Sequence, residues 1–125
     1  MNTIKNKNLV KYINDNAILL DANLEGLTIY QIDNKLNVDL TFSNCRKTKN
    51  NLILTLSEVK KINFYYDDTW YFYSIERFKL IENKSEYYLS LDPYDESNVM
   101  NDEDGGVIIS KKITWKLLPA KWGFN

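Results

Sequence analysis

The chain has 125 residues, of which 44% are hydrophobic, a formal net charge of −1 at pH 7, no histidine and one cysteine. Its length fits one domain spanning residues 1–125, and its hydrophobic content excludes a globally disordered chain. A near-neutral protein lacks the sustained basic face that general nucleic-acid binding requires. The absence of histidine excludes a Ser-His-Asp acyl-transfer site. We therefore expect neither a nucleic-acid partner nor this kind of hydrolase.

Apolar runs are short throughout the sequence, and asparagine and lysine interrupt the N-terminal stretch. No run has the length of a signal peptide, and none approaches the ~18 apolar residues of a membrane-spanning helix. The single cysteine, Cys45, excludes an intrachain disulfide. We expect a cytoplasmic protein with no membrane association and no cofactor.

Residues 6–15 predict a short helix. Its apolar residues fall at helical spacing: Leu9, Val10, Ile13 and Ala17. Asn6 or Asn8 stands where a side chain can cap the first turn. This pattern is typical of a helix that packs one face on a sheet.

From Leu24 onward the pattern changes to period two. Residues 26–32 and 35–43 predict two strands joined by a turn at Asp33 and Asn34. In the second strand, alternate residues are apolar: Leu36, Val38, Leu40 and Phe42. Such alternation indicates a half-buried antiparallel strand.

Further strands are expected at residues 52–56, 59–66, 70–81, 86–91 and 107–118. Ser57 and Glu58 suggest a turn or bulge between the first two of these, and residues 83–85 suggest another turn. The total is seven to nine strands. We predict an α+β fold that is mainly an antiparallel sheet, curled or folded into a sandwich or open barrel, with one N-terminal helix.

Carboxylates are concentrated near the C-terminal third, in residues 92–106, which we call the acidic loop. Between Asp92 and Ser110 there are six acids and no lysine or arginine: Asp92, Asp95, Glu96, Asp102, Glu103 and Asp104. Their mutual repulsion is tolerated when a cation or a basic partner offsets it. A solvated loop is the equally weighted alternative. Pro93 and Asp92 favour a structured turn at its start.

A calcium site in the acidic loop is the first metal to consider. Met100, Asp102, Asp104 and Gly105 match the spacing of the first half of an EF-hand loop. However, Met100 supplies no oxygen, and Lys111 stands where the bidentate glutamate belongs. We therefore predict no metal site.

Aromatic residues cluster at 64–66 and 70–73. Neighbours on a strand point to opposite faces, so some of these rings must face solvent. We expect Phe64, Tyr66 and Phe72 in the core. The orientation of Tyr65, Trp70, Tyr71 and Tyr73 stays open, because exposed tyrosine and tryptophan suit a protein interface or a carbohydrate platform.

Catalytic residues are scarce. Cys45 precedes Arg46 and Lys47, which can lower a thiol pKa, but no imidazole base is present to assist it. Carboxylates massed on one loop do not suit a paired-carboxylate glycosidase, and no glycine-rich phosphate loop occurs. We expect a protein that is not an enzyme.

Three segments carry a resemblance to a known group of proteins: Leu-Glu-Gly-Leu at 24–27, Leu-Ile-Leu-Thr-Leu at 52–56, and Tyr-Tyr-Leu-Ser-Leu-Asp-Pro-Tyr-Asp-Glu at 87–96. With the acidic loop and the apolar strand after it, the chain resembles small, mostly-β bacterial immunity proteins encoded beside polymorphic or contact-dependent toxins. The resemblance implies tight, non-covalent neutralisation of a cognate toxin, for which a basic nuclease-type domain is one candidate.

We predict that an acidic and aromatic surface binds this partner. Its candidate residues are Trp70, Tyr71, Tyr73, Asp92, Tyr94, Asp95, Glu96, Asp102, Glu103 and Asp104. The acids would steer association, and the aromatic rings would then be buried. The alternative is a carbohydrate-binding, calcium-binding or structural β-domain. Either a monomer or a homodimer formed through an exposed edge strand is compatible with the sequence.

Overall fold

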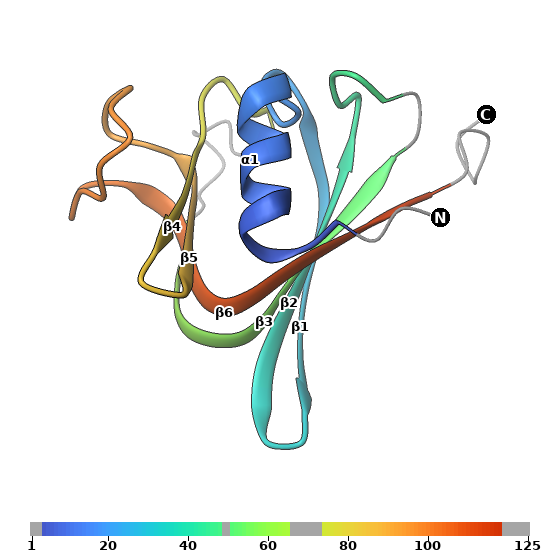
Figure 1. Cartoon of the computed structure of the whole chain (residues 1–125), viewed down its shortest axis with the longest axis vertical. Coiled ribbons are helices and arrows are strands. Elements are labelled where there is room, and N and C mark those ends of the chain that lie inside the picture. Colours follow the sequence, from blue (N-terminus) through green and yellow to red (C-terminus); the bar gives the residue numbers. More distant parts are fainter. Residues whose placement is uncertain (1–3, 49–50, 66–73, 119–125) are drawn as a thin grey trace.

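The computed structural model describes residues 4–48, 51–65 and 74–118. They form one helix and one antiparallel sheet (Figure 1). The elements are α1 (Asn6–Asn16), β1 (Asn23–Ile32), β2 (Lys35–Ser43), β3 (Leu52–Asn63), β4 (Lys79–Asn83), β5 (Glu86–Asp92) and β6 (Gly105–Leu117). The strand order is β1-β2-β3-β6-β5-β4. This confirms a mainly antiparallel fold with one short helix.

The sheet has six strands in the described part of the chain, fewer than the seven to nine predicted. The expected break at Ser57 and Glu58 is a bulge within β3. Glu58 has a φ of 55°, and the register with β6 shifts between Val59 and Lys61. A bulge bends a strand without ending it. The amide oxygen of Asn37 accepts the Glu58 N–H at 3.2 Å, so this irregular peptide is satisfied.

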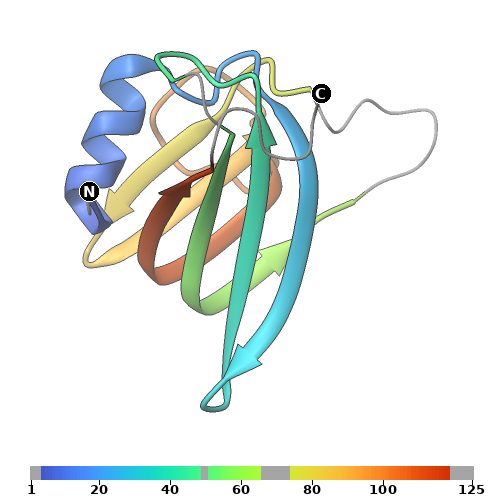
Figure 2. The ribbon, with the colours of Figure 1, turned by 90° about the vertical axis from the view of Figure 1, so that its right-hand side faces the viewer.

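The sheet curls around α1, which lies on its concave side (Figures 1 and 2). Leu9 and Ile13 of the helix are fully buried against strand residues such as Phe42 and Ile113. Near the start of β1, the Ile75 N–H donates to the Ala22 carbonyl at 2.9 Å, and Ser74 bridges Asn23. The core therefore fills the space between the helix and the curled sheet.

The first turn of α1 differs from the predicted capping. Neither Asn6 nor Asn8 caps it, because the N-cap is Lys5, which makes no side-chain cap bond. The Asn6 Oδ1 instead accepts the backbone N–H of Ile113 at 3.1 Å. This bond joins the start of the helix to β6. None of the described helical residues forms a helix long and apolar enough to cross a membrane.

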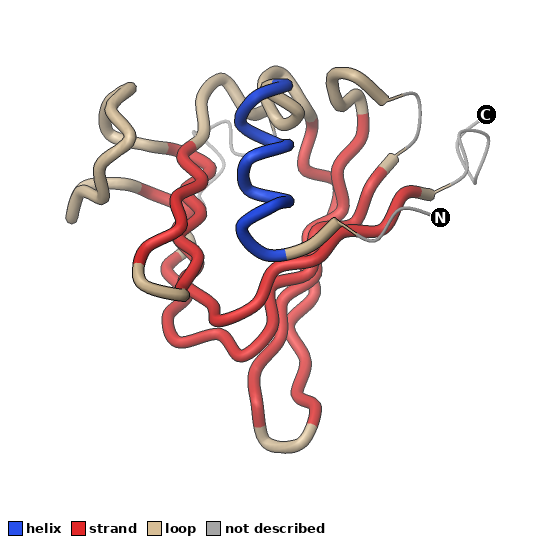
Figure 3. Tube along the Cα trace, in the orientation of Figure 1, coloured by secondary structure: helices blue, strands red, loops and turns tan. Residues whose placement is uncertain are grey.

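The predicted turn between β1 and β2 is confirmed. Asp33 and Asn34 both have positive φ, 53° and 64°, as in a type I′ turn, whose twist matches that of the strands it joins. Lys84 and Ser85 repeat this arrangement between β4 and β5. The apolar alternation in β2 is confirmed for Val38, Leu40 and Phe42, which are fully buried in the core, whereas Leu36 near the turn is only half-buried. Figure 3 shows how short the helix is beside the strands and their connecting loops.

Candidate functional site

The acidic loop connects β5 to β6 and folds beside β4. Lys79 and Tyr88 belong to these neighbouring strands, and both point away from the face that buries Leu80 and Leu89, because successive strand residues alternate. The loop therefore packs on the side of the sheet opposite α1.

Asp104 is the centre of this packing. The Lys79 ammonium lies 3.0 Å and 3.2 Å from its two carboxylate oxygens. The Tyr88 hydroxyl donates to Asp104 at 2.7 Å, the Tyr94 backbone N–H at 2.8 Å and the Asn101 backbone N–H at 3.1 Å. The side chains of Lys79 and Asp104 are 1% and 0% exposed. A fully bonded buried carboxylate of this kind fixes the path of the loop.

Lys79 serves as the cation of the acidic loop. Its ammonium also lies 2.9 Å from an oxygen of Asp95 and donates to the Val99 carbonyl at 2.7 Å. It therefore offsets the charges of two of the six acids, Asp95 and Asp104. Lys79 was not among the residues predicted from the sequence, although a lysine within the apolar run Phe78-Lys79-Leu80-Ile81 was an available signal.

The pKa values follow from this geometry. Burial opposes ionisation of Asp104, but its hydrogen bonds, led by that from Tyr88, outweigh burial and lower its pKa. Burial likewise opposes the charge of Lys79, yet its bonds to Asp95 and Asp104 raise its pKa. Burial, together with Asp104, raises the pKa of Tyr88. At neutral pH the site is thus an ion pair that accepts a bond from a neutral tyrosine.

A calcium site gains no support from this arrangement. The carboxylates of Asp95 and Asp104 are bound to the Lys79 ammonium. Within residues 4–48, 51–65 and 74–118, no group of three or more histidine, cysteine, aspartate or glutamate side chains is placed to hold a metal ion.

The outer surface of the acidic loop is both charged and apolar. Tyr94 is 60% exposed and Val99 is 66% exposed, and Met100 is also exposed. Exposed acids lie among them in the sequence. We call this surface the docking face: Tyr94, Glu96, Val99, Met100, Asp102 and Glu103. Exposed apolar and acidic side chains thus alternate along this part of the loop.

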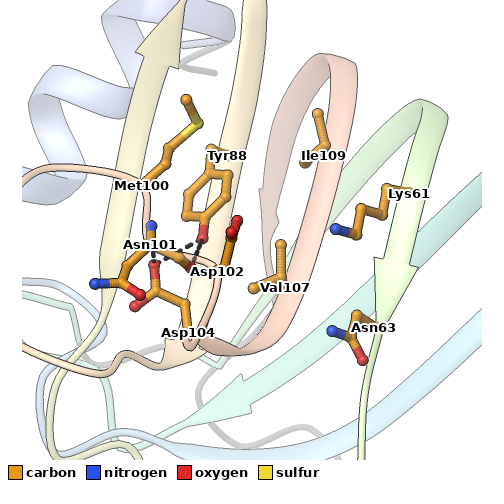
Figure 4. A pocket seen from close by; sticks show the side chains of 9 residues that line it. All are labelled: Lys61, Asn63, Tyr88, Met100, Asn101, Asp102, Asp104, Val107 and Ile109. Atoms are coloured by element: carbon orange, nitrogen blue, oxygen red, sulfur yellow. Dashed lines mark hydrogen bonds between the residues drawn. The ribbon is translucent and has the colours of Figure 1, made fainter.

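A pocket of about 340 Å³ lies beside the docking face. Figure 4 shows Lys61 and Asn63 of β3 on one side and the loop residues on the other. Its lining is completed by Tyr88, Met100, Asn101, Asp102, Asp104, Val107 and Ile109. No ion pair involving Lys61 or Asp102 is found among the described residues. Besides the paired carboxylate of Asp104, the pocket thus presents one charge of each sign, Lys61 and Asp102, next to the apolar side chains of Val107 and Ile109.

The predicted contact residues fall into three groups. Asp92, Tyr94, Glu96, Asp102 and Glu103 are exposed on the acidic loop, and Asp95 is half-buried beside Lys79. Asp104 is buried and holds the loop from within. The predicted contacts Trp70, Tyr71 and Tyr73 lie outside the described residues.

Asp92 and Glu96 both lie near Arg77. Asp92 is exposed overall, but partial burial of its carboxyl group raises its pKa, although the nearby Arg77 works in the opposite direction. An Arg77 nitrogen lies 3.8 Å from a carboxylate oxygen of Glu96, whose side chain remains well exposed. The contact with Arg77 therefore leaves the Glu96 carboxylate open to a partner.

Two other predictions from the sequence concern the aromatic cluster and Cys45. Phe64 is half-buried and packs against the core, as predicted, whereas Tyr66 and Phe72 lie outside the described residues. Cys45 is buried, and burial raises the pKa of its thiol to about 12. The basic neighbours of Cys45 therefore do not produce a reactive thiolate.

No family model, curated protein or solved structure matches the chain. The resemblance to immunity proteins therefore rests on the sequence pattern, and the site is interpreted from its own geometry.

Proposed function

We propose that the chain is a protein-binding module whose docking face receives a basic partner protein, and that it acts as an immunity protein neutralising a toxin in the bacterial cytoplasm. One observation carries the proposal. The acidic loop exposes acids and apolar side chains while Asp104 and Lys79 hold it from inside. A surface ordered before binding loses less conformational entropy when it meets a partner.

The charge distribution supports a basic partner. Lys79 offsets the charges of Asp95 and Asp104, whereas Asp102 and Glu103 are exposed and Glu96 only approaches Arg77. Exposed charges of one sign accelerate association with a surface of the opposite sign. The remaining acids therefore suit the long-range step of binding.

The apolar residues suit the short-range step. Tyr94 offers a rigid ring of the kind that recurs in binding hot spots, and Met100 has a flexible side chain that adapts to a partner. The adjacent pocket adds Lys61 and Asp102, one on each side. A partner segment carrying both an acidic and a basic side chain would pair both charges.

The proposal is tested with a cognate toxin, sought as the product of the gene that neighbours this one. We expect Asp102→Lys/Glu103→Lys to slow association by about tenfold or more at low salt, because steering contributes on the order of 10–10³ to association rates. The difference should shrink at high salt, where charges are screened. The matched control is Asp15→Lys/Glu25→Lys, which changes net charge equally but lies on α1 and β1.

Stopped-flow or surface-based kinetics would measure both variants against the unmodified chain. Equal association rates for Asp102→Lys/Glu103→Lys and the unmodified chain at low salt would contradict the proposed role of the docking face. Asp104 is left unchanged because its carboxylate is buried, so its reversal would test folding instead of binding.

A second candidate function is binding of a small polar ligand in the pocket. The observation that favours it is the pocket volume, about 340 Å³, at the lower end of the range of ligand sites. Chemical-shift changes at Val107 and Ile109 on adding a panel of sugars and amino acids would support this function. Unchanged spectra at millimolar ligand would count against it.

A further inference from the structure

The two edges of the sheet differ in length and protection. The edge strand β1 spans ten residues, whereas the opposite edge strand β4 spans five. An edge strand presents unpaired N–H and C=O groups, which form a template for another strand. Proteins usually protect such edges by shortening them, charging them or covering them.

The β4 edge has all three protections. It is short, and it carries the exposed charge of Glu82. The Asn14 side chain of α1 donates to the Leu80 carbonyl at 2.9 Å, so part of this edge is already bonded. Another chain would have to displace the helix to pair here.

The β1 edge is less protected: it is long, and its one charge, Glu25, lies near its start, at the register shift between Leu24 and Gly26. Its sequence, Asn-Leu-Glu-Gly-Leu-Thr-Ile-Tyr-Gln-Ile, contains no lysine, arginine or proline. Ile29 is 49% exposed and Ile32 is 54% exposed. Within the described part of the chain, a backbone bridge on the outer side of β1 is found only at Asn23, with Ser74.

The turn decides which peptide groups face outward. A two-residue hairpin turn makes its flanking residues, Ile32 and Lys35, a hydrogen-bonded pair, and such pairs alternate along an antiparallel ladder. Thr28 therefore directs its peptide groups toward β2. Those of Leu27 and Ile29 face away from the sheet.

We infer that β1 pairs antiparallel with β1 of a second copy of this chain, around a two-fold axis at Thr28. This register is self-complementary, because it sets Leu27 opposite Ile29 of the second copy. It also sets Glu25 opposite the uncharged Gln31. Moving the axis to Ile29 would instead set Glu25 opposite Asp33, and like charges directly opposite are destabilising.

This pairing would join two sheets into one continuous sheet across the dimer. A contact made mainly by one strand buries less than the ~1,600 Å² of a standard stable interface. The dimer is therefore concentration-dependent, and its test must detect a weak complex. The inference is independent of the docking face, which lies on the β5–β6 connection.

Disulfide trapping tests the register directly. At the axis, the two copies of Thr28 form a non-hydrogen-bonded pair with Cα atoms about 4.5 Å apart, which a disulfide can span. We expect Thr28→Cys to give a disulfide-linked dimer as the main product of mild oxidation. The control is Ile32→Cys, exposed on the same strand and face but about 26 Å from its copy in this register, at ~3.3 Å per residue. The unmodified chain controls for the buried Cys45.

A higher yield from Thr28→Cys than from Ile32→Cys would support the inference. Equal yields, or no cross-linked dimer from Thr28→Cys, would overturn it.

The solution mass provides a second measurement without cysteines. We expect Ile29→Lys to lower the dimer fraction at least tenfold in sedimentation experiments, because it places a charge on the pairing edge. Val99→Lys, the same kind of change at an exposed position on the docking face, should leave the dimer fraction unchanged. An unmodified chain that stays monomeric at millimolar concentration, or a dimer that only Val99→Lys disrupts, would overturn the inference.

Discussion

The two ends of this sheet treat their polar groups in opposite ways. At the β4–β5 end, a buried lysine and a buried aspartate bond one another, a tyrosine and loop peptides. At the β1 end, a long strand leaves its outer edge uncovered by described residues and exposes isoleucines. One end is completed by the chain itself, whereas the other offers backbone groups to a second chain. The difference shows how one curled sheet can carry an ordered loop and an open edge together.

The largest expected effect comes from removing the cation at the β4–β5 end. Lys79→Met should lower the free energy of unfolding by about 3–5 kcal/mol, because it leaves Asp104 buried with its charge unpaired. Urea denaturation would measure the loss. Lys60→Met is the matched control, since Lys60 pairs with Glu86 at an exposed site, where such pairs contribute about 0–1 kcal/mol. Similar losses for both variants would contradict the importance of burial.

Acid should weaken the same end. The folded pKa of Asp104 is lowered, so the unfolded chain binds its proton first as pH falls. Its contribution to stability is therefore present above the ordinary aspartate pKa of about 4 and is lost as pH falls through the lower folded pKa. Urea denaturation between pH 7 and pH 2 would follow this loss. The profile of Asp104→Asn should be flatter below pH 4, and parallel profiles would contradict the assignment.

Removing the hydroxyl group of one tyrosine at each end of the sheet is a smaller change that also compares the two ends. Tyr88→Phe should cost about 1–3 kcal/mol of unfolding free energy, because it removes a donor from a buried carboxylate. Tyr30→Phe removes a bond of 3.0 Å to Asp39 near the β1 end, where both residues are half-buried and Thr55 also donates to Asp39. Its cost should stay below about 1 kcal/mol. Thermal and urea unfolding would measure the loss of stability in each variant. A larger loss for Tyr30→Phe than for Tyr88→Phe would contradict the comparison between the two ends.

The smallest expected effect tests whether the two ends are independent. Cys45 lies after β2, and its thiol pKa of about 12 predicts negligible alkylation by iodoacetamide in the folded protein at pH 8. The rate of Cys45 alkylation should also stay low in Lys79→Met at denaturant concentrations that leave the protein folded. Mass spectrometry of labelled peptides would measure it. Fast labelling of Cys45 in Lys79→Met under these conditions would show that disrupting the acidic loop also opens the β1–β2 end of the sheet.

Local patterns predicted much of the fold. The helix, the alternation in β2 and the turn at Asp33 and Asn34 each depend on residues close in sequence, and all three are found. The sequence left a turn and a bulge open at Ser57 and Glu58, because the irregular backbones of both favour similar polar residues, and the structure shows the bulge.

The candidate site was predictable only in part. The density of acids in the acidic loop was visible in the sequence, but the distinction between exposed and buried acids was not. That distinction depends on Lys79, which is 25 positions from Asp104 and belongs to another strand. No local pattern identifies which of six similar carboxylates a distant ammonium will bind.

The bond between Asn6 and Ile113 also bears on the order of events during synthesis. These residues are 107 positions apart, yet they join the first turn of α1 to β6. At roughly 5–20 residues per second, a ribosome adds the β6 residue about 5–20 s after the helix residue. The apolar face of the helix therefore stays uncovered by β6 until nearly the whole described chain has been synthesised. Among the described elements, α1 is thus the first to leave the ribosome, and β6, which completes the sheet around it, is the last.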